Sequence, residues 1–76
     1  MDWQQRIEMK KDVLCGKPVV KGTRLSVEHL VGLLAQGWPE ADVIDAYPGI
    51  TREDLLACLK YAAEAVANEQ LFPLET

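Results

Sequence analysis

Glycine and proline residues divide the last two-thirds of this 76-residue chain into three short helical segments. The first segment is expected to begin after Ser26, a good N-cap residue, and to end at Gly37, where a left-handed backbone is usual. The second begins at Pro39 and stops at Pro48-Gly49, after about two turns. The third begins after Thr51, with an acidic residue three positions later in an approximate capping box.

The third segment carries more apolar residues than one face of a helix needs. Leu55, Leu59, Ala62 and Val66 follow the spacing of a single helical stripe, which we expect to face the core. Further apolar residues widen that stripe: Leu56, Cys58, Ala63 and Ala67. We therefore expect this helix to be covered by more than its own small domain.

The N-terminal third is predicted to be a short strand arm. Residues 7–10 alternate apolar and polar side chains, as a half-buried strand does, and residues 19–21 are a β-branched run that can pair with them. Residues 1–6 are expected to be a loose lead-in. Because an isolated two-stranded ribbon is barely stable in water, the arm must rest on the helices or pair with a second copy.

The second and third helices have the lengths and the connecting turn of a helix-turn-helix unit. In that interpretation Pro39–Ala46 is the supporting helix, Tyr47–Ile50 is the turn, and the helix from Arg52 enters the major groove of DNA. The predicted fold class is mainly α, a single domain with a strand arm (1–25), a three-helix helix-turn-helix-like bundle (26–68) and a tail (69–76). A domain this small buries only about 60% of its unfolded surface, so we expect a homodimer.

Charge is divided sharply along the chain. Residues 1–25 hold six basic and three acidic residues, whereas residues 26–76 hold two basic and nine acidic ones. The candidate DNA-binding residues are basic and lie mostly in the arm: Lys10, Lys11, Lys17, Lys21, Arg24, Arg52 and Lys60. An alternative stays open for the lysines of the arm, because lysines also keep exposed strand edges soluble.

Two acidic residues argue against DNA contact through the third helix. Glu53 and Asp54 at its start would repel phosphates, and we interpret them as capping and dipole-complementing residues. For Arg24, beside the start of the first helix, we favour an ion pair with Glu28 or Asp45.

The sequence offers no pattern typical of catalysis or of metal binding. Gly16-Lys17 superficially resembles a phosphate-binding loop, but the order of its residues is wrong. His29 has no Cys or His at metal-ligand spacing, so neither a metal nor a cofactor is predicted. No nucleophile has a plausible base, and no pair of carboxylates is singled out, which argues against an enzyme and a small-molecule substrate. With no disulfide framework, no leader and no apolar run of about 20 residues, a cytoplasmic protein without membrane contact is expected.

Several motifs in combination resemble one protein family. The chain reads GKPVVKGTR from Gly16 to Arg24, Gly37 follows the first helix, and Tyr47-Pro48 precedes Thr51. Over roughly residues 6–66 this pattern is similar to the domain of unknown function 433 family, whose members are small bacterial and archaeal proteins. Many of them are regarded as antitoxin-like partners of a toxin with a PIN-like nuclease fold. The resemblance implies a helix-turn-helix-like domain behind a short strand arm, and it assigns no established chemical role to any residue.

The residues and the resemblance together predict an antitoxin-type DNA-binding protein. The arm would contact operator DNA or assist the dimer, and the acidic helices with the apolar tail would mask a basic, PIN-like toxin. In the tail, Leu71, Phe72 and Leu74 are the candidate partner-binding residues. The alternative is a dimeric protein-interaction module without DNA binding, and an RNA-binding accessory domain is a more distant option.

Overall fold

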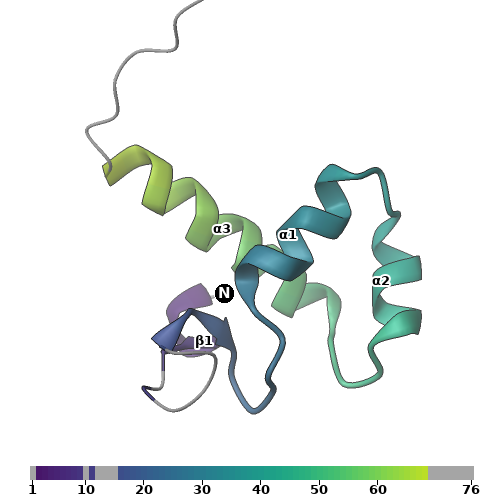
Figure 1. The fold of residues 1–76 in the computed structure, drawn as a ribbon, viewed down its shortest axis with the longest axis horizontal. Helices are drawn as coiled ribbons and strands as arrows, with labels where there is room; N and C mark the ends of the chain where they lie inside the picture. The colour runs from purple at the N-terminus through teal and green to yellow at the C-terminus, as the bar shows by residue number, and fades with distance from the viewer. Residues whose placement is uncertain (1, 10, 12–15, 69–76) are drawn as a thin grey trace, which may run out of the picture.

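The protein is mainly helical, with three α-helices and a small two-stranded antiparallel sheet near the N-terminus (Figure 1). The computed structural model describes residues 2–9, 11 and 16–68. The helices are α1 (Val27–Ala35), α2 (Glu40–Ala46) and α3 (Arg52–Asn68). α3 contacts both other helices and β1 (Ile7–Glu8), so it forms the centre of the fold. No helix in the described part of the chain is long and apolar enough to cross a bilayer.

α1 begins and ends where the capping residues predict. The Ser26 side chain accepts a hydrogen bond from the backbone N–H three residues on, at 2.9 Å. At the other end Gly37 has a φ of 99°, and its N–H donates to the carbonyl of Leu34 at 3.0 Å. The N–H of Trp38 donates to the carbonyl of Leu33 at 3.1 Å. These two bonds make a Schellman motif, which satisfies the last carbonyls of the helix and reverses the chain toward α2.

α3 begins with a complete capping box, as the sequence predicted in outline. The N–H of Asp54 donates to Thr51 Oγ1 at 3.2 Å, and the N–H of Thr51 donates to Asp54 Oδ2 at 3.0 Å. The two residues therefore satisfy each other's backbone donors at the helix start. α2, in contrast, begins at Glu40 with Pro39 just outside it, and Pro39 makes no side-chain capping bond.

The arm pairs within one chain, which settles a question that the sequence leaves open. β1 lies antiparallel to β2 (Val19–Val20), with Ile7 opposite Val20 and Glu8 opposite Val19. Both valines are buried, so the ribbon rests on the helices. β1 is shorter than predicted, because it ends before Met9, whose side chain is largely exposed.

The expectation of a loose lead-in at residues 1–6 is wrong. Trp3–Gln5 form a short 3₁₀ helix, η1, capped by the Asp2 side chain. η1 packs on α3, where the Trp3 ring meets the Tyr61 ring edge-on at 5.8 Å between centroids. Trp3 is the apolar residue in an otherwise polar stretch, and the packing of its half-buried ring on α3 explains why the segment folds back.

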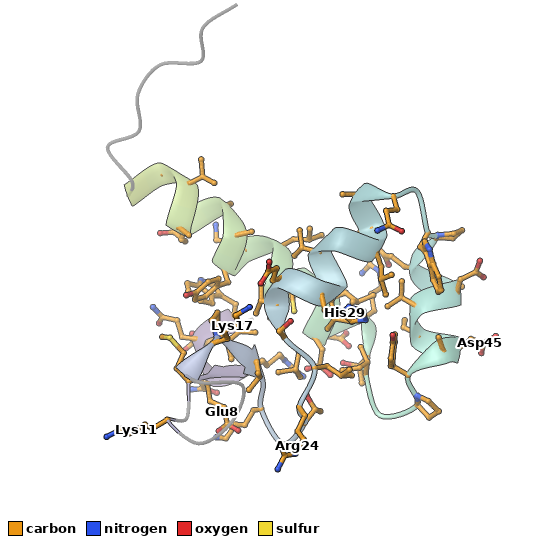
Figure 2. The ribbon with its side chains drawn as sticks, viewed as in Figure 1. Glu8, Lys11, Lys17, Arg24, His29 and Asp45 are labelled. Atoms are coloured by element: carbon orange, nitrogen blue, oxygen red, sulfur yellow. The ribbon has the colours of Figure 1, made fainter. Side chains whose placement is uncertain are left out.

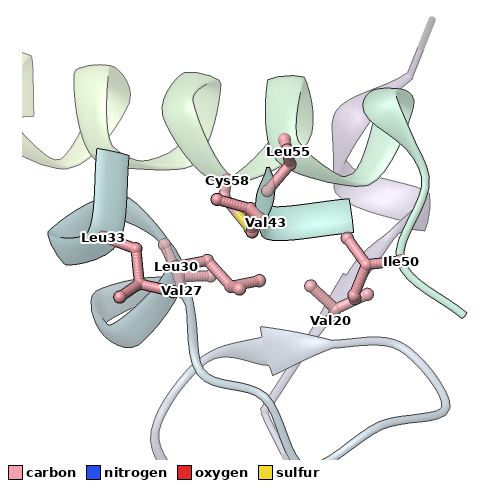
Figure 3. Close-up of a cluster of buried hydrophobic side chains, with 8 residues drawn as sticks. All are labelled: Val20, Val27, Leu30, Leu33, Val43, Ile50, Leu55 and Cys58. Atoms are coloured by element: carbon pink, nitrogen blue, oxygen red, sulfur yellow. The ribbon is translucent and has the colours of Figure 1, made fainter. Parts of the chain in front are cut away.

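Buried side chains from the arm and all three helices meet in one core (Figure 3). The cluster contains Val20, Val27, Leu30, Leu33, Val43, Ile50, Leu55 and Cys58. The predicted core stripe of α3 is only partly correct, since Leu55 is fully buried but Leu59 and Val66 are 39% and 63% exposed. α3 has two apolar rows: the row containing Leu55 and Cys58 lies in the core cluster with side chains of α1, and the other is left toward solvent.

Candidate interaction surfaces

An ion pair joins the arm to the start of α3. The Arg6 guanidinium donates to Asp54 Oδ1 at 3.0 Å, while the other carboxylate oxygen of Asp54 takes part in the capping box. Asp54 is buried, whereas Arg6 keeps 40% of its side chain exposed. The sequence does not predict this contact, because 48 positions separate the two residues and no local pattern links them.

The predicted DNA-binding residues do not gather into one basic patch. Lys17 pairs with Glu28 at 3.2 Å, and Arg52 pairs with Glu40 at 3.1 Å. The remaining described cations lie apart: Lys21 lines a mixed-charge hollow of about 500 Å³ with Asp2, Gln5, Arg6, Glu53 and Asp54, and Lys60 lies on α3. Lys10 lies outside the described residues.

The ion pair expected for Arg24 is not formed. Glu28 pairs with Lys17 instead, and Asp45 lies on the outer side of α2, far from Arg24 in Figure 2. Arg24 and Lys11 are both exposed and point away from the helices along one edge of the arm (Figure 2). Among the described residues, neither has an ion-pair partner. They remain available as candidate phosphate contacts.

Exposed carboxylates dominate the surface of α2 and the start of α3. Asp42, Asp45 and Glu53 are exposed, and none of them forms an ion pair with a residue that the structure describes. Asp42 and Asp45 therefore give α2 an exposed negative charge that no described residue neutralises, whereas Glu53 lies in the mixed-charge hollow with Lys21 and Arg6.

The exposed apolar row of α3 borders a hollow. Trp3, Leu56, Leu59, Lys60 and Ala63 line this space of about 420 Å³. The expectation that α3 carries apolar surface beyond the needs of its own domain is thus supported. The candidate partner-binding residues of the tail, Leu71, Phe72 and Leu74, lie outside the described residues.

Cys58 and His29 belong to residue types that are common in catalytic and metal sites, but here both have structural surroundings. Burial, with a smaller contribution from the nearby Asp54 charge, raises the pKa of the Cys58 thiol to about 12, so this cysteine stays protonated and unreactive near neutral pH. His29 Nε2 and the Tyr47 hydroxyl are 2.8 Å apart and tie α1 to the end of α2. No cluster of three metal-ligating side chains occurs within residues 2–9, 11 and 16–68. Cys15 is not among the residues described.

The fold and these surfaces define a small, mainly helical domain with a short N-terminal sheet and exposed carboxylates on α2. The chain belongs to the DUF433 family of proteins of unknown function, whose model matches residues 7–62. It is similar to the crystal structure of a DUF433 member protein from Anabaena variabilis, with 33% sequence identity and a TM-score of 0.79. The match covers 84% of this chain and 63% of that protein, so this chain spans less than two-thirds of its length. A comparison with curated protein sequences found no match.

Proposed function

We propose that this protein is an antitoxin-type regulator whose acidic helices bind a basic partner protein, a toxin with a PIN-like nuclease fold. The observation that carries the proposal is the pair of exposed carboxylates Asp42 and Asp45 on α2, which have no ion-pair partner in the described part of the chain. Such a surface resembles a phosphate backbone in charge, and it would accelerate association with the nucleic-acid groove of a nuclease.

The proposal includes a helix-turn-helix arrangement of α2, the turn Tyr47–Ile50 and α3. The turn contains Gly49 at a φ of 110°, and the N–H of Ile50 donates to the Tyr47 carbonyl at 3.0 Å. The start of α3 is nevertheless poorly suited to DNA, because Glu40 neutralises Arg52 and Glu53 stays exposed. In this proposal the acidic helices serve a protein partner.

The partner proposal predicts binding that depends on salt and on α2. The test is co-expression with the protein encoded by the neighbouring reading frame, followed by calorimetry at about 50 and 500 mM salt. We expect the double variant Asp42→Asn/Asp45→Asn to bind at least about tenfold more weakly at low salt. The matched control Glu28→Gln/Glu64→Gln removes the same charge elsewhere and should bind nearly normally.

Two outcomes would contradict the partner proposal. One is a neighbouring frame that encodes no basic, nuclease-like protein, with none co-purifying. The other is equal weakening by both double variants, which would mean that only the net charge matters and that α2 is not the binding surface.

A second candidate function is DNA binding by the arm. It is favoured by Lys11, Lys21 and Arg24, which are exposed and without an ion-pair partner among the described residues. Cations of this kind bind phosphates with little sequence preference and with strong salt dependence. A strand ribbon is also one of the elements that proteins use to approach a DNA groove.

DNA binding predicts a specific change in salt dependence. With a duplex of the protein's own upstream DNA, Lys21→Gln/Arg24→Gln should reduce the slope of log K against log salt by about 1.8, or about 0.9 for each lost phosphate contact. Lys17→Gln/Lys60→Gln removes two cations outside this set and should leave the slope nearly unchanged. Absence of binding at low salt, or equal changes in both variants, would rule out the arm as a DNA contact.

A further inference from the structure

We propose that α3 binds α3 of a second copy of this chain, antiparallel, about a two-fold axis that passes the helix at the level of residue 61. The interface is the exposed row of Leu56, Leu59, Ala63 and Val66, which we call the α3 seam. Its spacing of three, four and three residues is that of the a and d positions of a coiled coil. No member of the α3 seam belongs to the buried core cluster, and Leu59, Ala63 and Val66 are exposed.

The α3 seam already has the shape of a coiled-coil hole. Leu56, Leu59, Lys60 and Ala63 border the hollow of about 420 Å³, and they stand in the relation i, i+3, i+4 and i+7. Four residues in this relation form the hole into which a side chain of a facing helix inserts. Trp3 adds a wall on one side, because its ring is held against Tyr61.

The pattern of side-chain sizes favours an antiparallel second copy. When two copies of α3 pair about residue 61, Leu56 of one lies opposite Val66 of the other, and Leu59 lies opposite Ala63. The same contacts then occur twice, as a two-fold interface requires. A parallel pair would place Ala63 opposite Ala63, leaving a gap near the centre of the interface, which close packing disfavours.

Charges beside the α3 seam are complementary under the same axis. Lys60 and Glu64 are exposed on one side of it, and neither has an ion-pair partner within the described residues. The antiparallel arrangement places Lys60 and Glu64 of both copies together on one side of the apolar centre, so the four side chains form a group of two positive and two negative charges. A surface with one charge of each sign suits a copy of itself better than a uniformly basic partner.

This inference goes beyond the proposed function, because it does not involve α2 or the basic residues of the arm. A single helix face makes a small interface. Its buried area should lie near the lower end of the range for specific complexes, about 1,200 Å² in total, so the dimer should be weak and reversible. Analytical ultracentrifugation of the full chain between about 10 μM and 1 mM should show a concentration-dependent monomer–dimer equilibrium.

Substitution within the α3 seam tests the surface. Ala63→Glu places a charge at the centre of the interface and should give a monomer at every concentration. Ala41→Glu makes the same change at an exposed position of α2 and should dimerise like the wild type. Circular dichroism should show equal helicity in both variants. Binding of the basic partner should be unchanged in Ala63→Glu. The two proposals are therefore tested separately, one by partner binding and the other by dimerisation.

A charge exchange tests the antiparallel register. Lys60→Glu and Glu64→Lys should each dimerise about tenfold more weakly, since each places like charges together. An equimolar mixture of the two variants should form a heterodimer, because both cross-pairs are again opposite in charge. The proposal is wrong if the wild type stays monomeric at about 1 mM or if Ala63→Glu still dimerises. It is also wrong if the equimolar mixture of the two variants fails to associate. Dimers that form only after removal of residues 69–76 would contradict it as well, because they would indicate that the chain's own tail covers the α3 seam.

Discussion

Leu55→Ala is expected to lower the free energy of unfolding by about 2–5 kcal/mol, the usual cost of truncating a fully buried leucine. Leu55 is 0% exposed and lies in the core among side chains from the arm and all three helices. A 76-residue domain has a total stability of only about 4–11 kcal/mol, so the loss is a large fraction of the whole. Chemical denaturation monitored by circular dichroism measures it, and the melting temperature should fall by about 10 °C or more.

Leu59→Ala is the matched control, with the same change on the same helix. Leu59 is 39% exposed and has no place in the core cluster, so its truncation should cost less than about 1 kcal/mol. The comparison belongs at a protein concentration where the chain is monomeric. Equal losses for the two variants would show that both apolar rows of α3 are buried in the monomer, contrary to the structure.

Asp54→Ala is expected to destabilise the protein by about 1.5–3 kcal/mol. The change removes the capping box of α3, which typically contributes about 0.5–2 kcal/mol. It also leaves the Arg6 guanidinium without its partner at 3.0 Å. Because the Arg6 side chain is 40% exposed, solvent screens this pair, and its own contribution should lie near 1 kcal/mol rather than at the larger values of buried pairs.

Glu53→Ala provides the control for Asp54, because Glu53 is the neighbouring carboxylate, is exposed and forms no ion pair with a described residue. Its replacement should change stability by less than about 0.5 kcal/mol. A double-mutant cycle of Asp54→Ala with Arg6→Ala then isolates the link between the arm and α3, with an expected coupling of about 1 kcal/mol. A coupling of zero would mean that Arg6 does not hold the arm on α3.

The candidate sites were less predictable from sequence than the helices. The basic residues could be identified as a group, yet Lys17 and Arg52 are occupied by Glu28 and Glu40, eleven and twelve positions away. Lys60, chosen as a DNA contact, lies beside the apolar hollow of α3 instead. Whether a cation is available depends on which carboxylate the fold brings near it, and linear spacing does not contain that information.

The sequence by itself determined the ends of the helices. Ser26, Gly37 and Thr51 act on backbone groups only a few positions away, so their capping bonds follow from local chemistry. Only the tertiary structure decided which apolar row of α3 is buried and how Arg6 reaches Asp54. The reason is that both rows have helical spacing, so the choice between them depends on contacts between residues far apart in the sequence, such as those of α1 with α3, and the Arg6–Asp54 pair likewise spans most of the chain.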